Sequence, residues 1–333
     1  MSSEALFSSS FCLGGEHMRD LHKMLILVGL ALAACGVYLF QDLNGSFDYA
    51  LPRRGVKVFA MVLTGVAIAY ATVVFQTITH NRILTPSIMG LDALYMLLQT
   101  LLIFFLGSDH ITIMNKQVNF VLSIAAMVIF ALLFYQLLFR KNNQPIYFLL
   151  LIGIVCGTFF GSISTFLQVL IDPNEFQIVQ DQMFASFNNV NSDLVWLSVI
   201  IIALLIIFAW KNNSSLDVLT LGRDTSVNLG VDYDALVKKM LVLSAVLIAI
   251  ATALVGPITF FGLIVANLSY QFFRTYKHSV IILGAAVISI VALVGGQWVV
   301  ERLFTFNTTL SVIINFIGGV YFIYLLLKES RSK

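Results

Sequence analysis

The chain has 333 residues, of which 59% are hydrophobic and only 11% are charged, and its mean hydropathy is +0.94. A water-soluble core cannot absorb this much apolar surface, so the composition predicts a protein embedded in lipid, with no soluble domain. The formal net charge of +2 gives no reason to expect a nucleic-acid partner.

Residue types that bind metals or form disulfides are few and scattered. The three cysteines and five histidines show no CxxC or HExxH spacing, so we expect no metal site, no disulfide and no cofactor in this chain. Residues 1–17 lack the basic start and apolar run of a signal peptide, and Met18 is as suitable a start as Met1. We expect a cytoplasmic segment at 1–23, a transmembrane domain at 24–328 and a cytoplasmic tail at 329–333.

Ten apolar runs follow one another along the chain. They lie near Met24–Phe40, Val56–Phe75, Ser87–Leu106, Val118–Phe139, Ile146–Leu170, Leu194–Trp210, Met240–Val255, Ile258–Tyr270, Ser279–Val299 and Leu310–Leu327. Most have the roughly 17–25 residues that a membrane-spanning helix needs. The eighth has about thirteen, which at 1.5 Å per residue gives roughly 20 Å, less than the roughly 30 Å hydrocarbon core.

The distribution of Lys and Arg indicates whether the short run crosses the membrane. With ten crossings and both termini in the cytoplasm, fourteen Lys and Arg lie inside and five outside. If the short run does not cross, the tally becomes ten inside and nine outside. Because cytoplasmic loops carry the excess of positive charge, we predict ten crossings. Each crossing is expected to be an α-helix, so the predicted fold class is all-α.

The pair Gly256-Pro257 stands between the seventh and eighth runs and predicts a break. We expect it to end one helix and start the short one, since Pro is tolerated at the first turn of a helix. Broken backbone at membrane depth survives only where protein or a water-filled cavity covers it. The break therefore indicates either a shielded path or a packing kink inside the bundle.

The fifth run carries a strip of small and polar residues. Glycines four residues apart allow helices to approach closely, and polar side chains follow them at spacings of three: Gly153, Gly157, Gly161, Ser162, Thr165 and Gln168. We expect the glycines to serve packing and the polar part to face a pathway. Asp92 is the only acidic residue we expect within a run, near its cytoplasmic end, where a helix N-terminus would stabilise it.

The chain has no nucleotide-binding motif of the GxxxxGK[ST] type and no catalytic constellation. We therefore expect it not to be an enzyme, so that ATP and Mg²⁺, if used, are bound by another polypeptide. The dearth of buried charge argues against the alternative of an ion-coupled carrier.

The longest cytoplasmic loop, 211–239, predicts a docking element for such a partner. Two short helices, each ended by a glycine, would present apolar residues, with lipid contact as the alternative. The residues concerned are Leu216, Leu219, Leu221, Gly222, Leu229 and Gly230.

Two further features lie in the outer loops. The acidic loop 171–193 has the periodicity of an amphipathic surface helix. Arg53, Arg54 and Arg302 place positive charge outside, against the usual bias, and we expect them to bind carboxylates of an extracellular partner.

Four motifs together resemble the permease family of bacterial iron–siderophore and cobalamin ABC importers. They are Leu51-Pro52-Arg53, the spacing of Asn81, Pro86 and Gly90, the pair Leu221-Gly222 with Leu229-Gly230-Val231, and Gly256-Pro257-Ile258 through Gly262-Leu263-Ile264-Val265. The stretch NTTLSVIINFIGG, residues 307–319, resembles the branch that handles ferric catecholate siderophores of the petrobactin and anguibactin kind.

This resemblance implies a permease subunit in the bacterial cytoplasmic membrane that imports a ferric siderophore. It also implies a second, non-identical permease subunit, two ATPase subunits docked on the loop 211–239, and an extracytoplasmic binding protein. A haem or cobalamin importer is the alternative substrate class within the same family.

Overall fold

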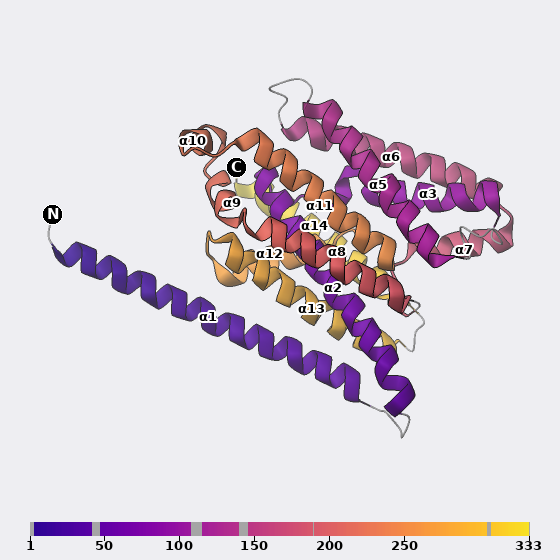
Figure 1. Ribbon diagram of the computed structural model, residues 1–333, viewed down its shortest axis with the longest axis horizontal. Helices are drawn as coiled ribbons and strands as arrows, with labels where there is room; N and C mark the ends of the chain where they lie inside the picture. Colours follow the sequence, from indigo (N-terminus) through magenta and orange to yellow (C-terminus); the bar gives the residue numbers. More distant parts are fainter. Residues whose placement is uncertain are drawn as a thin grey trace.

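A computed structural model describes residues 3–41, 47–107, 115–139, 146–188, 190–304 and 308–332, and within these ranges it contains helices and no strand (Figure 1). The elements in chain order are α1 (Ser3–Phe40), α2 (Phe47–Thr79), the 3₁₀ helix η1 (Pro86–Met89), α3 (Leu91–Leu106), α5 (Lys116–Phe139), α6 (Ile146–Leu170), α7 (Pro173–Met183), α8 (Ser192–Trp210), α9 (Asn213–Leu219), α10 (Arg223–Asn228), α11 (Tyr233–Val255), α12 (Phe261–Phe273), α13 (His278–Arg302) and α14 (Leu310–Ser332).

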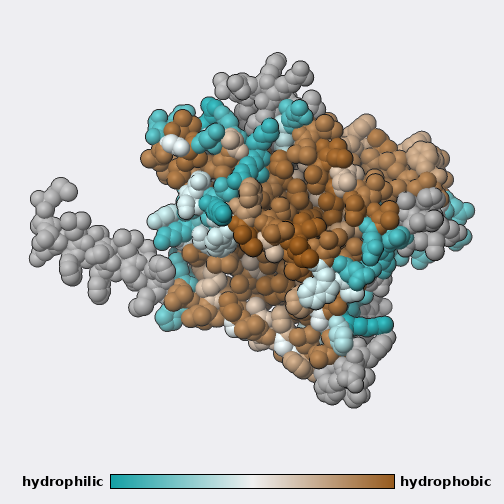
Figure 2. Space-filling view, viewed as in Figure 1, coloured by the Kyte–Doolittle hydropathy of each residue, from teal (hydrophilic) through white to brown (hydrophobic). Residues whose placement is uncertain are grey.

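Among the described residues, eight helices are long and apolar enough to cross a membrane: α1, α2, α5, α6, α8, α11, α13 and α14. Two shorter apolar helices, α3 and α12, have 16 and 13 residues. Figure 2 shows the apolar surface as a broad band with hydrophilic residues toward its edges. These ten apolar elements confirm the predicted all-α membrane fold.

Helix α2 lies at the centre of the bundle. In its apolar stretch Ala50–Thr79, 78% of the most apolar window is buried, against 17% for α6 and 22% for α14. Small residues permit this burial: a Cβ on Gly65 would lie 2.6 Å from the Ser289 hydroxyl of α13. The peripheral helices α6 and α14 therefore leave most of their surface for lipid or for another subunit.

The structure corrects two predicted boundaries. The third run is not one helix from Ser87, because η1 ends at Gly90, whose φ is +84°, before α3 begins. The short helix α12 begins at Phe261 instead of Ile258. Residues 3–23 belong to the same continuous helix as the first span, α1.

The two ends of the bundle carry different elements. Helices α9 and α10 lie at one end and α7 at the other (Figure 1). Helix α7 is the predicted surface helix, and its Val179 is fully buried in a small cluster with Ile103 and Ile171. The chain after α12 returns to the α9 end, where the backbone N–H of His278 donates to Asp217 Oδ1 at 2.7 Å. The short eighth element therefore does carry the chain back across the bundle.

Candidate functional site

Helix α11 stops at a glycine that no other residue could replace without strain. Gly256 has φ +99° and ψ 172°, a region essentially restricted to glycine. A Cβ there would lie 2.9 Å from Cα of Ala185, in the loop between α7 and α8. The backbone N–H of Ser186 also donates to the Val255 carbonyl at 2.8 Å. The break predicted at this position is thus fixed by the loop between α7 and α8.

Pro257 follows this glycine but does not start a helix. Residues 256–260 are irregular, and Pro257 and Ile258 are buried within the chain. The predicted role of Pro257 at the first turn of the short helix is therefore wrong, because α12 begins four residues later, at Phe261. The chain itself covers this broken backbone, as a membrane environment requires.

A second break, at Gly90, packs against α6. A Cβ on Gly153 would lie 2.9 Å from Cα of Met89, and one on Gly90 would lie 2.9 Å from the Gly157 nitrogen. The packing role predicted for Gly153 and Gly157 is therefore observed. Gly161 has no heavy atom within 4 Å of the position of a Cβ, so it packs against nothing in this chain.

Asp92 connects the two breaks. It is buried in the first turn of α3 and accepts hydrogen bonds from the Thr259 hydroxyl at 3.1 Å and the Thr252 hydroxyl at 3.5 Å. Thr252 lies three residues before the end of α11, at the α7 side of the bundle. Asp92 therefore lies at the start of its helix, as the sequence predicts, but inside the bundle, because η1 precedes α3.

The polar strip of α6 divides into two parts. Ser162 and Thr165 are exposed, and their hydroxyls donate to carbonyls of their own helix at 2.9 Å. Gln168 instead turns toward α3 and donates to Ser164 at 3.0 Å, while Ser164 contacts the Thr100 hydroxyl at 2.9 Å. Only the part around Gly161, Ser162 and Thr165 therefore forms a polar surface open to a neighbour.

The predicted docking loop forms the two short helices α9 and α10. Gly230, after α10, has a φ of +84°, as expected for a residue that ends a helix, whereas Gly222, with φ of +92° and ψ of 167°, is the residue before the first turn of α10. An ion pair between Arg223 and Asp234, 2.9 Å long, ties α10 to α11 and raises the pKa of Arg223 above its usual range. The element is therefore built as the sequence predicts.

Its apolar residues, however, do not all face outward. Leu216 and Leu219 are 0% exposed and belong to the core of this chain, so they cannot contact a partner directly. Leu221 and Leu229 are 58% and 60% exposed, and Val227 beside them is 52% exposed. The surface available to a partner is therefore formed by Leu221, Val227 and Leu229.

Sequence analysis did not identify the polar contacts that hold α9. Asp217 of α9 accepts a hydrogen bond from Nδ1 of His278 at 2.6 Å, and Tyr70 of α2 donates to Asn213 at 3.1 Å. These partners are 61 and 143 residues apart in sequence, so no motif spacing connects them.

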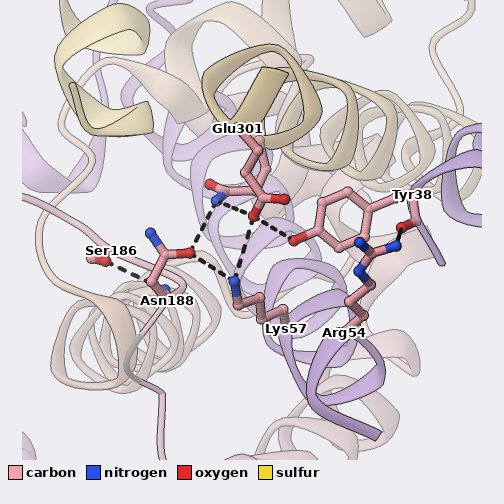
Figure 3. Close-up of polar contacts among 7 residues, drawn as sticks. Tyr38, Arg54, Lys57, Ser186, Asn188 and Glu301 are labelled. Carbon is pink, nitrogen blue, oxygen red and sulfur yellow. Dashed lines mark hydrogen bonds and ion pairs between the residues drawn. The ribbon is translucent and has the colours of Figure 1, made fainter. Parts of the chain in front are cut away.

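At the α7 end of the bundle, the Arg54 side chain contacts this chain itself, although we predicted that it would bind an extracellular protein. Its Nη1 donates to the carbonyl of Tyr38 at 3.3 Å (Figure 3) and to the carbonyls of Leu39 and Gln41 at 3.4 and 2.6 Å. These carbonyls end α1, where a helix leaves them without intrahelical partners and favours a cation. The geometry thus gives Arg54 a helix-capping role in place of the predicted docking role, whereas Arg53 and Arg302 are exposed at this end.

Glu301 is the centre of a polar cluster beside Arg54 (Figure 3). Its Oε1 accepts from the Tyr38 hydroxyl at 2.8 Å and from Gln297 at 3.0 Å, and it pairs with Lys57 at 3.4 Å. Lys57 also donates to Asn188 in the α7–α8 loop at 2.9 Å. The cluster joins α1, α2 and α13 to the loop that packs on Gly256.

The architecture and motifs agree with a known transporter family. A model described as the FecCD transport family matches residues 46–328. The chain belongs to the FecCD transport family. The resemblance inferred from the motifs is thereby confirmed.

Individual relatives agree with this assignment. The chain is 60% identical over 315 residues to the petrobactin import system permease protein YclO of Bacillus subtilis, covering 95% of this chain and 100% of that protein. It is 34% identical to the petrobactin import system permease protein FatC of Bacillus anthracis, over 99% and 94% of the two chains. A solved structure described as an inward-facing metal-chelate type ABC transporter has the same fold, with a TM-score of 0.81, 20% identity and coverage of 93% and 99%.

Proposed function

We propose that this chain is the membrane permease subunit of an ATP-driven importer whose cargo is a ferric siderophore of the petrobactin class. The supporting observation is the 60% identity to a petrobactin import permease along its whole length. At this level of identity, we expect most residues that line the transport path to be the same in the two proteins. The few ionisable groups within the spans favour passage of a bulky chelate over coupling to an ion gradient.

The path would run between this chain and a second permease subunit. The open polar surface of Gly161, Ser162 and Thr165 supports this placement, because it lies on a helix that is otherwise exposed and apolar. Two different petrobactin permeases, FatC and FatD, are named in Bacillus anthracis, with 34% and 26% identity to this chain. A non-identical partner is therefore the arrangement we propose.

The remaining partners would bind at the two ends. Two ATPase subunits would carry ATP and Mg²⁺, and one of them would dock on Leu221, Val227 and Leu229, whose exposed apolar side chains suit a protein contact. A siderophore-binding protein would dock at the other end, near Arg53 and Arg302. The excess of Lys and Arg at the α9 end supports a location in the cytoplasmic membrane with both termini inside.

Uptake of radiolabelled iron tests the substrate. Cells that lack this subunit, complemented with the gene, should import ferric petrobactin and should not gain uptake of ferric hydroxamates, haem or cobalamin. Recovery of haem or cobalamin uptake without ferric petrobactin uptake would contradict the proposal and favour the alternative substrate class.

A pair of variants on α6 tests the path. Gly161→Phe would place a ring on the open polar surface and should abolish iron uptake. Val155→Phe, at an exposed position on another face of the same helix, should leave it unchanged. If both variants are present in the membrane in equal amounts and support equal iron uptake, this surface does not line the path.

A further inference from the structure

A buried histidine joins the docking helix α9 to α2 and α13. His278 is the first residue of α13, and its side chain is 2% exposed. Its Nδ1 donates to Asp217 Oδ1 of α9 at 2.6 Å, and its Nε2 lies 2.8 Å from the Thr77 hydroxyl of α2. One imidazole therefore connects three helices that meet at the α9 end.

The connection is rigid because each polar group has more than one partner. Asp217 Oδ1 also accepts the backbone N–H of His278 at 2.7 Å, so the carboxylate holds both the side chain and the first turn of α13. With both ring nitrogens in hydrogen-bond contact, the imidazole has a single orientation. A displacement of α9 must either move α13 with it or break these bonds.

Other contacts make α9 part of the same rigid unit. Asn213 at its start accepts from Tyr70, and the carbonyl of Leu219 at its end is 3.1 Å from Nε2 of His80, just after α2. Ser226 of α10 donates to the Val218 carbonyl at 3.0 Å. A force applied to the exposed residues around α10 would therefore reach α9 and, through it, α2 and α13.

Helix α13 extends this connection to the opposite end of the molecule. Its 25 residues give a length of about 37 Å between His278 and Arg302. Glu301, in its last turn, holds Lys57 and Tyr38 in the cluster of Figure 3. Both ends of this helix are thus fixed by polar contacts, one set at the docking element and one at the outer loop.

We propose that Asp217 and His278 are positioning residues for transport: their contact transmits movement of the ATPase-docking helix to α2 and α13. This inference rests on the proposed function, because it requires an ATPase that docks on this end. The contact does not take part in docking itself, since Asp217 and His278 face α13 and α2, whereas Leu221, Val227 and Leu229 face outward.

Proteoliposomes that contain the complete importer test the proposal. Two quantities are measured: ATP hydrolysis and siderophore transported per ATP, each with and without loaded binding protein. Asp217→Ala and His278→Ala should still copurify with the ATPase and hydrolyse ATP, but transport per ATP should fall by about tenfold, a typical size for a coupling between sites. The double variant should be no worse than either single variant, because both remove the same contact.

Conservative variants separate transmission from folding. Asp217→Asn keeps an oxygen that accepts both N–H groups and should retain most of the coupling. His278→Asn places a donor near Asp217 only and His278→Gln near Thr77 only, so each should lose coupling although the pocket stays filled. Asp20→Ala, which removes the same charge from the ion pair with Lys23 on α1, outside the docking element, is the matched control and should transport normally.

The outcomes distinguish this inference from the proposed function. Wild-type transport per ATP in Asp217→Ala, or in both His278→Asn and His278→Gln, would overturn the transmission role. If the Ala variants do not assemble, the Asn and Gln variants decide in the same way. If the wild-type complex hydrolyses ATP but does not transport ferric petrobactin, the proposed substrate is wrong. The effect of the Asp217 and His278 variants on ATP hydrolysis can still be measured in that case.

Discussion

Replacing Gly256 by alanine tests whether the broken helix is fixed as the structure indicates. Gly256 combines two constraints, a φ of +99° with ψ 172° and a backbone neighbour where a Cβ would stand. The conformation alone costs a residue with a side chain about 1–3 kcal/mol. The new Cβ would also lie 2.9 Å from Cα of Ala185 and 3.2 Å from its nitrogen, and these atoms cannot move away by a change of rotamer.

Together these terms give a loss of about 2–4 kcal/mol in the free energy of unfolding, since overpacking adds about 1 kcal/mol or more. Gly295→Ala is the matched control, because no heavy atom lies within 4 Å of its Cβ position inside helix α13. It should be neutral or slightly stabilising, by up to about 1 kcal/mol, since alanine favours a helix.

The assay is thermal unfolding of the detergent-solubilised permease, followed by loss of the monodisperse peak on size exclusion. Gly256→Ala should lower the Tm by several degrees relative to wild type and to Gly295→Ala. Iron uptake should fall further than the amount of protein in the membrane, because the segment 256–260 and Asp92 meet at this break. Equal Tm values for the two variants would refute the reasoning from backbone conformation and close approach.

Three further predictions address the ends of the molecule. Leu221→Asp should abolish copurification with the ATPase while the permease still inserts, because an unpaired charge buried in that contact costs several kcal/mol, on the order of 3 or more; undiminished copurification would remove this residue from the docking surface. In a background without the native cysteines, an impermeant thiol reagent added outside intact cells should label Asp193→Cys, in the first turn of α8, and should not label Lys277→Cys. Labelling of position 277 from outside would overturn the ten-span topology. Arg54→Ala should lower the Tm, since it removes the hydrogen bonds to the end of α1, whereas Arg53→Glu should weaken binding-protein docking most at low salt. An unchanged Tm in Arg54→Ala, or a docking defect in Arg53→Glu that does not depend on salt, would contradict these roles.

Several properties of this protein follow from the sequence alone because they are local. A bilayer imposes a length and an apolar composition on each crossing, so ten apolar runs and the short eighth run could be counted directly. Positive φ is nearly restricted to glycine, which is why breaks at Gly222, Gly230 and Gly256 could be predicted before any contact was known. The family motifs lie at these same breaks.

Other properties were decided only by tertiary structure. The periodicity of the docking loop does not separate the buried Leu216 and Leu219 from the exposed Leu221, because burial depends on where α2 and α13 pass. Arg54 has the sequence context of an outward-facing charge, yet the end of α1 comes close enough to bind it. The local pattern of α3 likewise placed Asp92 at a helix N-terminus but not its depth in the bundle, which η1 and α11 determine.

The contact between Asp217 and His278 depends in the same way on the fold. Each residue is unremarkable in its own segment, and the two are 61 positions apart. They meet because α9 folds back under the first turn of α13, an arrangement stabilised by long-range packing that no periodicity in a single sequence encodes. The sequence alone determines how often the chain crosses the membrane and where it breaks, while the tertiary structure determines which polar groups meet at those breaks and ends.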